Sequence, residues 1–292
     1  MKLKLILASF ILICSSSQSW GATPRDQLLT LTQKWIGTPY GFGPLGEGED
    51  GRFDQDPLYR FDQFDCVTFV ETALSAALTK NHADFKKHMN HIRYKDGEVD
   101  YLTRNHFSEV DWIPNNLENG MLFEVLWVVQ KRTRYALPIA VAKIDKKNWY
   151  AKKSVAEIRV IGASEQKKQK LLKKLRSSGR IFEVEVSQLP YVPFSEFLDN
   201  SSEFSDQILS GLPPVMVLSV VRPGWDLVKV AGTELNITHQ ALLLQTENGW
   251  VVRHATSDSR YQVVEDSLKD FLAQRQKTAG VAGIHLVGVN GF

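Results

Sequence analysis

The spacing of apolar positions changes several times along the chain, and each change marks an expected element. Residues 24–36 carry leucines at helical spacing, and this pattern stops at Gly37 and Pro39. A second helical pattern runs through FDQFDCVTFVETALSAAL, where Asp65 is suited to cap the helix. We therefore expect a buried helix whose first turn contains Cys66.

The segments next to these helices have a different character. Residues 38–60, TPYGFGPLGEGEDGRFDQDPLYR, are rich in glycine and proline and should be irregular. Long irregular loops inside compact domains are usually functional. Residues 85–101 predict a short helix followed by a hairpin at Asp96-Gly97.

The pattern changes again between residues 121 and 214. LPIAVAKI and AEIRVIG alternate and predict strands, whereas SEQKKQKLLKKLRSSG predicts a basic helix. A solvated helix face explains the lysines better than a site for an anionic ligand. We interpret 121–214 as an inserted or accessory lobe, between residues 23–120 and residues 215–292 of a core domain.

The last part of the chain is rich in strand signals. VMVLSVVR, THQALLLQT, GWVVRHAT and AGIHLVGV are four strand candidates, and Asn248-Gly249 predicts a hairpin turn between the second and the third. His239 begins one of these two strands and His254 ends the other, so the hairpin should bring them together. The fold class expected is α+β, with the Cys66 helix packed on an antiparallel sheet.

The N-terminal segment has the layout of a secretory signal peptide. Lys2 and Lys4 precede an apolar run, and small residues close residues 1–22. The apolar run is too short to span a bilayer, and no later segment is long enough. Ile13 stands where a lipoprotein signal needs a small residue, which argues against lipid attachment at Cys14. The mature protein is expected in the periplasm or outside the cell.

Charge and cysteine content narrow the classes of function. The formal charge of +2 includes the two signal-peptide lysines, so the mature chain is close to neutral and nucleic-acid binding gains no support. The sequence has two cysteines, and export leaves Cys66 without an internal partner. It is then a buried small hydrophobe, an intermolecular crosslink or a reactive nucleophile.

The position of Cys66 favours the nucleophile. A thiol attacks an amide as the thiolate, and the backbone N–H groups of a first helical turn favour that form and can bind an oxyanion. His239 is the candidate base, and His254 can orient it. The other histidines have simpler interpretations: surface positions for His82, His88 and His91, and a structural role for His285.

With these residues identified, the pattern resembles the NlpC/p60 branch of papain-like peptidoglycan hydrolases. The matching places are Asp65-Cys66, Thr238-His239 and Arg253-His254-Ala255. The strings TPYGFGPLGEG, FDCVTFVETALSAAL, IRYKDGEVDYLTRNHF and DWIPNN resemble the N-acetylmuramoyl-L-alanine amidase-like family, domain of unknown function 1460. The resemblance covers residues 38–116 and 215–292, and Ala241 stands where that branch commonly has glycine.

The resemblance implies a papain-like core and an exported cysteine amidase. Its substrate would be a peptidoglycan fragment, cut at the amide between anhydro-N-acetylmuramic acid and L-alanine in wall turnover or recycling. No metal or organic cofactor is required. The expected roles are Cys66 as nucleophile, His239 as general base and then acid, and His254 as orienter, with Asp65 or Tyr40 assisting the Cys66 N–H at the oxyanion. A muramyl peptide offers carboxylate, carbonyls and hydroxyls, so the expected substrate contacts are Arg104, Asn105 and His106.

Two other functions remain open at this point. One is an endopeptidase that cuts the γ-D-glutamyl to diamino-acid bond of the stem peptide. The other is a non-catalytic module that binds the cell wall. The sequence leaves the oligomeric state unknown.

Overall fold

The structure is a computed structural model of the chain, and it describes residues 23–133, 135–198 and 203–292. The predicted signal peptide, Cys14 included, lies outside the described residues. Within the described ranges no helix is both long and apolar enough to cross a membrane.

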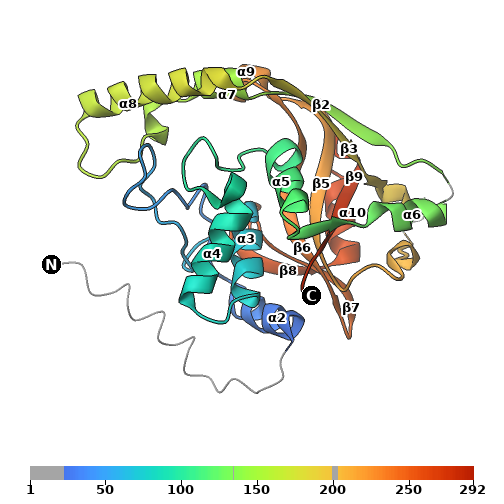
Figure 1. Cartoon of the computed structure of the whole chain (residues 1–292). Helices are drawn as coiled ribbons and strands as arrows, with labels where there is room; N and C mark the ends of the chain where they lie inside the picture. The colour runs from blue at the N-terminus through green and yellow to red at the C-terminus, as the bar shows by residue number, and fades with distance from the viewer. Residues whose placement is uncertain (1–22, 134, 199–202) are drawn as a thin grey trace.

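A seven-stranded antiparallel sheet lies at the centre of the molecule, in the order β1-β9-β5-β6-β7-β8, with β4 also paired to β9 (Figure 1). Its strands are β1 (Leu122–Glu124), β4 (Val192–Pro193), β5 (Val215–Asp226), β6 (Glu234–Thr246), β7 (Gly249–Ala255), β8 (Val263–Ser267) and β9 (Gly283–Val289). A separate ribbon pairs β2 (Ile139–Asp145) with β3 (Val184–Pro190). The predicted α+β class is confirmed.

Helices surround this sheet, with α8 at the periphery of the molecule (Figure 1). They are α2 (Pro24–Lys34), α3 (Cys66–Ala77), α4 (His82–Arg93), α5 (Ile113–Glu118), α6 (Leu126–Thr133), α7 (Lys146–Lys152), α8 (Glu165–Ser178), α9 (Val228–Ala231) and α10 (Leu268–Gln276). Short 3-10 turns occupy Lys95–Gly97, Val155–Glu157, Gly179–Ile181, Phe194–Glu196 and Gln207–Leu209, and a π turn occupies Ser108–Trp112.

The sheet buries both of its faces. Because successive side chains of a strand point to opposite faces, β6 contributes to two cores. Leu242 and Leu244 lie in the core that includes α3, whereas Ala241 and Leu243 lie in the core that includes α6 and α10. This burial on both faces explains why the strand candidates are almost continuously apolar.

The start of α3 is fixed by a capping box. The Thr68 backbone N–H donates to Asp65 Oδ1 at 2.8 Å, and the Asp65 backbone N–H donates to Thr68 Oγ1 at 2.9 Å. From Thr68 to Ala77 nearly every residue of the helix is buried. The prediction that Cys66 lies in the first turn of a buried, Asp65-capped helix is confirmed.

Other sequence predictions needed correction. AEIRVIG is not a strand: Ser154 caps a 3-10 turn with its own side chain, and such local bonds compete with strand pairing. At Asp96-Gly97 the chain makes a 3-10 turn instead of a regular hairpin. The β6–β7 turn is shifted by one residue, since Thr246 pairs with Gly249 and leaves 247–248 as its centre.

The division into lobes at 121 and 214 stays a prediction. The structure shows that this segment is joined to the central sheet, because β1 and β4 both pair with β9. Helix α6 also contributes Leu126 and Val129 to the core on one face of the sheet. The basic helix predicted within residues 121–214 forms as α8 and is capped by Ser164.

Two arginines join the first helix to the sheet: Arg25 of α2 donates from Nη2 to the Gln245 carbonyl of β6 at 2.6 Å, and Arg253 makes more contacts. Arg253 on β7 donates from Nη1 to the Leu29 carbonyl at 2.9 Å and from Nη2 to Gln33 Oε1 at 2.9 Å. The same guanidinium pairs with Glu265 of β8. One side chain therefore joins α2, β7 and β8.

A buried ion pair holds α3 against α4. Arg93 Nη1 lies 2.7 Å from Glu71 Oε2, and both side chains are almost fully buried. Trp112 Nε1–H donates to Glu71 Oε1 at 3.1 Å, and Arg93 Nη2 donates to the Leu45 carbonyl at 3.0 Å. The pair thus also fixes the irregular loop that precedes α3.

The substitution Glu71→Gln tests this arrangement. It keeps the shape of the side chain but leaves Arg93 as an uncompensated buried charge, so we expect the free energy of unfolding to fall by about 3–5 kcal/mol. Urea denaturation followed by tryptophan fluorescence measures the change. Glu118→Gln on the exposed side of α5 is the matched control, expected within about 0.5 kcal/mol of the parent. Equal effects of both substitutions would contradict the role of the pair.

Candidate active site

Cys66 is the first residue of α3, and it meets β6 beside His239. The backbone N–H groups of Gln240, the residue after His239, and of Val67 and Cys66 itself act to lower the pKa of the thiol. Cys66 keeps part of its surface exposed. Cys66 therefore lies next to the strand that carries the predicted base, with its thiol group itself buried.

The two predicted histidines lie where β6 and β7 stop pairing. The paired register of these strands ends at Leu242 and Arg253. His239 and His254 lie just beyond that end, and their rings are joined by a hydrogen bond of 2.9 Å between His239 Nε2 and His254 Nδ1. The prediction that the hairpin brings these residues together is confirmed.

A carboxylate extends this pair. His254 Nε2 lies 3.2 Å from Oδ2 of Asp266 on β8, the strand next to β7. Arg260 Nη1 donates to the other oxygen of Asp266 at 2.6 Å. Both imidazoles pack on the ring of Phe271 from α10, with centroid distances of 6.3 Å for His239 and 5.1 Å for His254.

The protonation states of the hydrogen-bonded series His239, His254 and Asp266 can be worked out by starting from the Asp266 carboxylate. Burial acts to raise the pKa of Asp266, but hydrogen bonds from His254 and Arg260 lower it to about 2, so Asp266 is ionised and only accepts. Burial lowers the pKa of both His254 and His239, so both rings are neutral near pH 7.

Each neutral imidazole has one N–H, and the hydrogen bonds show which of its two nitrogens carries the proton. His254 Nε2–H donates to Asp266, which leaves its Nδ1 as an acceptor. His239 Nε2–H then donates to that nitrogen. The remaining nitrogen of His239, Nδ1, carries a lone pair, so His239 has the tautomer that a proton acceptor needs.

The protonation of Cys66 differs from the sequence prediction of a depressed pKa. Burial raises the pKa of the thiol to about 12, and the negative charge of Asp65 acts in the same direction against the three N–H groups. Because the pKa of His239 is lowered at the same time, the site without ligand holds a neutral thiol and a neutral imidazole. The proton must leave Cys66 during attack on a substrate.

Tyr40 reaches the site from the irregular loop. Burial raises the pKa of its hydroxyl, electrostatic interactions with Cys66 and Asp65 raise it further, and a hydrogen bond with Ser257 opposes them. Tyr40 is therefore a proton donor close to the thiol. Asp65 instead uses its carboxylate as the cap of α3, and its charge would repel an oxyanion.

The predicted substrate contacts Arg104, Asn105 and His106 make other interactions. Arg104 pairs with Glu47 and Asp54, and the Asn105 side chain donates to the Ile92 carbonyl at 3.2 Å. His106 Nε2 lies 2.8 Å from the Tyr101 carbonyl, within a cluster of aromatic rings. These contacts give each residue a structural role, and their contact with substrate stays a prediction.

The comparisons with known proteins agree with this architecture. The family model of AmiA-like proteins, described as N-acetylmuramoyl-L-alanine amidase-like, matches residues 30–281. The chain belongs to the AmiA-like family. No curated protein is similar enough to match the chain.

Solved structures extend the likeness of this AmiA-like chain. A protein of Legionella pneumophila assigned to family DUF1460 is 33% identical with a TM-score of 0.86, over 92% of this chain and 89% of that chain. An N-acetylmuramoyl-L-alanine amidase of Bacteroides uniformis is 20% identical with a TM-score of 0.58, over 91% of this chain and 99% of that chain. The second likeness shows the fold alone.

Several groups at the site of this AmiA-like protein were not predicted. Asp266 and Arg260 come from β8 and the loop before it, and Arg275 comes from α10. The Arg275 guanidinium lies 5.0 Å from the ring centroid of Phe271, and its Nε has no hydrogen-bond partner among the described residues. Its charge lowers the pKa of His239, and Cys66 in turn acts on the pKa of Arg275.

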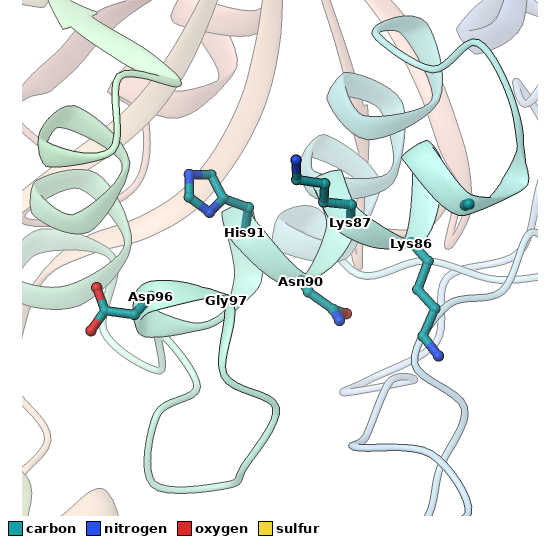
Figure 2. A pocket seen from close by; sticks show the side chains of 7 residues that line it. Lys86, Lys87, Asn90, His91, Asp96 and Gly97 are labelled. Carbon is teal, nitrogen blue, oxygen red and sulfur yellow. The ribbon is translucent and has the colours of Figure 1, made fainter.

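A surface hollow elsewhere is unrelated to this chemistry. Figure 2 shows Lys86, Lys87, Asn90 and His91 on α4 and Asp96 in the next turn at its rim. None of these residues belongs to the elements that carry the histidine pair. Within the described ranges no group of three or more His, Cys, Asp or Glu side chains is arranged to hold a metal ion.

The raised pKa of Cys66 predicts a steep pH dependence of alkylation. Because only the thiolate reacts, the rate of iodoacetamide modification without ligand should rise about tenfold for each pH unit between roughly pH 6 and pH 9. Mass spectrometry of the mature protein measures this rate. Asp65→Asn keeps a good helix cap and removes the charge, so it should react faster at each pH. A rate that is flat across this range would indicate a preformed thiolate instead.

Proposed function

We propose that this AmiA-like protein is a cysteine amidase with a papain-like catalytic core. The observation that carries the proposal is the chain from Asp266 through His254 to His239, which leaves a proton-accepting nitrogen on the strand that touches Cys66. The thiol, a base and a group that orients the base are the three parts that nucleophilic hydrolysis of an amide needs.

The first half of the reaction forms an acyl-enzyme. The Cys66 sulfur attacks the carbonyl carbon of the amide while its proton moves to Nδ1 of His239. The backbone N–H of Cys66 and the Tyr40 hydroxyl donate to the oxyanion of the tetrahedral intermediate. His239 then gives its proton to the leaving amine, the C–N bond breaks, and a thioester to Cys66 remains.

The second half restores the enzyme. His239 takes a proton from a water molecule that attacks the thioester, and the carboxylic acid leaves as the sulfur recovers its proton. His254 and Asp266 stabilise the imidazolium form of His239 at both stages. Arg275 would offset the negative charge on sulfur as it develops, since its guanidinium interacts electrostatically with Cys66 as well as with Asp258 and Asp266.

The substrate proposed is a muropeptide released from peptidoglycan. The family is described as N-acetylmuramoyl-L-alanine amidase-like, and the bond cleaved would join the lactyl group of anhydro-N-acetylmuramic acid to L-alanine. The layout of residues 1–22 supports export, so we place the activity in the periplasm or outside the cell. Its role there would be wall turnover or recycling.

Digestion of anhydro-muramoyl tripeptide tests the reaction. Mass spectrometry should find free L-Ala-γ-D-Glu-diamino acid, whereas muramoyl-L-Ala-D-Glu would identify a stem-peptide endopeptidase instead. Cys66→Ala should lower kcat by about 10⁴-fold or more, with circular dichroism to verify folding. Turnover that survives this substitution would remove the thiol from the mechanism, and absence of turnover in the parent would favour a binding module.

Asp266→Asn tests the tautomer assignment. An asparagine amide can donate to His254 Nε2, which reverses both imidazoles and places the proton on His239 Nδ1. We expect kcat to fall by about 10²–10⁴-fold with little change in KM. Nitrogen-15 chemical shifts of the two rings should report the reversal directly. Glu247→Gln in the exposed β6–β7 turn is the control, and an equal effect of both substitutions would refute the assignment.

A further inference from the structure

The loop between β7 and β8 holds a tyrosine in an unusual backbone conformation. Tyr261 has φ of 47°, in the left-handed region that disfavours a residue with a bulky side chain. The other non-glycine residue with positive φ among the described residues is Asp96, a small polar side chain in a turn, where this conformation is common. A tyrosine in this conformation therefore needs a separate explanation.

Neighbouring backbone fixes this conformation from both sides. The Tyr261 N–H donates to the Asp258 carbonyl at 3.0 Å, and the Tyr40 N–H donates to the Tyr261 carbonyl at 3.0 Å. The Val263 N–H donates to the Thr38 carbonyl at 2.8 Å. The loop is thus attached to the segment that carries Tyr40. Strain of this kind collects at ligand sites, where the surrounding structure can impose it.

The side chain of Tyr261 is exposed beside the nucleophile. Tyr261 is 54% exposed, and its ring centroid lies 5.1 Å from that of Tyr40 at an interplanar angle of 56°. Tyr40 pairs in an isolated parallel bridge with Phe64, two residues before Cys66, and the Gly41 N–H donates to the Phe64 carbonyl at 2.9 Å. An aromatic surface therefore extends from the segment just before Cys66 toward solvent.

We propose that Tyr261, supported by Tyr40, is the stacking surface for the pyranose ring of the substrate. One face of a pyranose presents mainly C–H groups, which pack on the electron-rich face of an aromatic ring and leave the hydroxyls in water. The strained backbone presents the ring at the mouth of the site, where the muramoyl side of the scissile amide would lie. This inference rests on the proposed amidase function and specifies how its sugar is bound.

The role of Tyr261 can be tested by binding, without turnover. In the Cys66→Ala background, titration calorimetry compares anhydro-muramoyl tripeptide with the same tripeptide lacking the sugar. Adding Tyr261→Gly removes the ring and suits the left-handed backbone, so affinity for the sugar-containing ligand should fall about tenfold while affinity for the free tripeptide is unchanged. Tyr261→Trp should retain sugar binding.

Two further measurements separate this role from a structural one. The melting temperature should rise in Tyr261→Gly, because glycine relieves the strain; a large drop would identify Tyr261 as structural and overturn the proposal. Trp127→Ala removes an aromatic ring of similar exposure, 55%, on α6, and it should leave both affinities unchanged.

The outcomes also distinguish this proposal from the amidase function. Two results would overturn the stacking surface: equal loss of affinity for both ligands in Tyr261→Gly, or no binding of the muramoyl ligand in the Cys66→Ala background. In either case, turnover by the parent protein would still decide whether the protein is an amidase. Sugar-dependent binding without turnover by the parent protein would support the stacking surface and refute the proposed amidase function.

Discussion

The hydrogen bonds between Asp65 and Thr68 determine where α3 begins, and the candidate site depends on that point. A start one residue later would turn Cys66 out of the first helical turn and away from the N–H groups that approach its sulfur. The same carboxylate carries a charge that disfavours the thiolate. The residue that positions the nucleophile thus adds to the effect of burial, which is the main cause of the raised pKa of the thiol.

A protonated thiol limits unwanted reactions of Cys66. The thiolate is the form that oxidants and electrophiles attack. In the mechanism proposed above, sulfur becomes nucleophilic only as it attacks a carbonyl and His239 accepts its proton, so Cys66 would react little in the absence of substrate. The hydrogen bonds from His239 to His254 and from His254 to Asp266 contribute to this low reactivity. They leave Nδ1 of His239 free to accept a proton while the imidazole stays neutral.

The parts that local pattern determines could be predicted from the sequence. The Cys66 helix follows from apolar spacing and a capping residue, and the meeting of His239 with His254 follows from a short turn between two strands. Asp266, Arg260 and Arg275 could not be found this way, because neither β8 nor α10 was anticipated and no motif marks them.

The role of a polar cluster is harder to predict. Arg104, Asn105 and His106 suggested ligand binding because polar side chains cluster there; the fold also surrounds them with carboxylates, carbonyls and aromatic rings of its own, and their contact with substrate stays a prediction. AEIRVIG alternates like a strand, yet the turn capped by Ser154 occupies its start, and pairing is limited to an isolated parallel bridge between Arg159 and Asp54. Periodicity identifies a strand only where a partner can pair with it along its length.

The hydrogen bonds from Arg253 to α2 join parts of the chain that are synthesised far apart in time. Arg253 and Leu29 are 224 residues apart in sequence, and the shared partner Glu265 lies later still. Contacts of such high sequence separation form late and slow the search for the native state. A growing chain cannot close this junction until Glu265 of β8 has been made, and by then Cys66, His239 and His254 have all been synthesised.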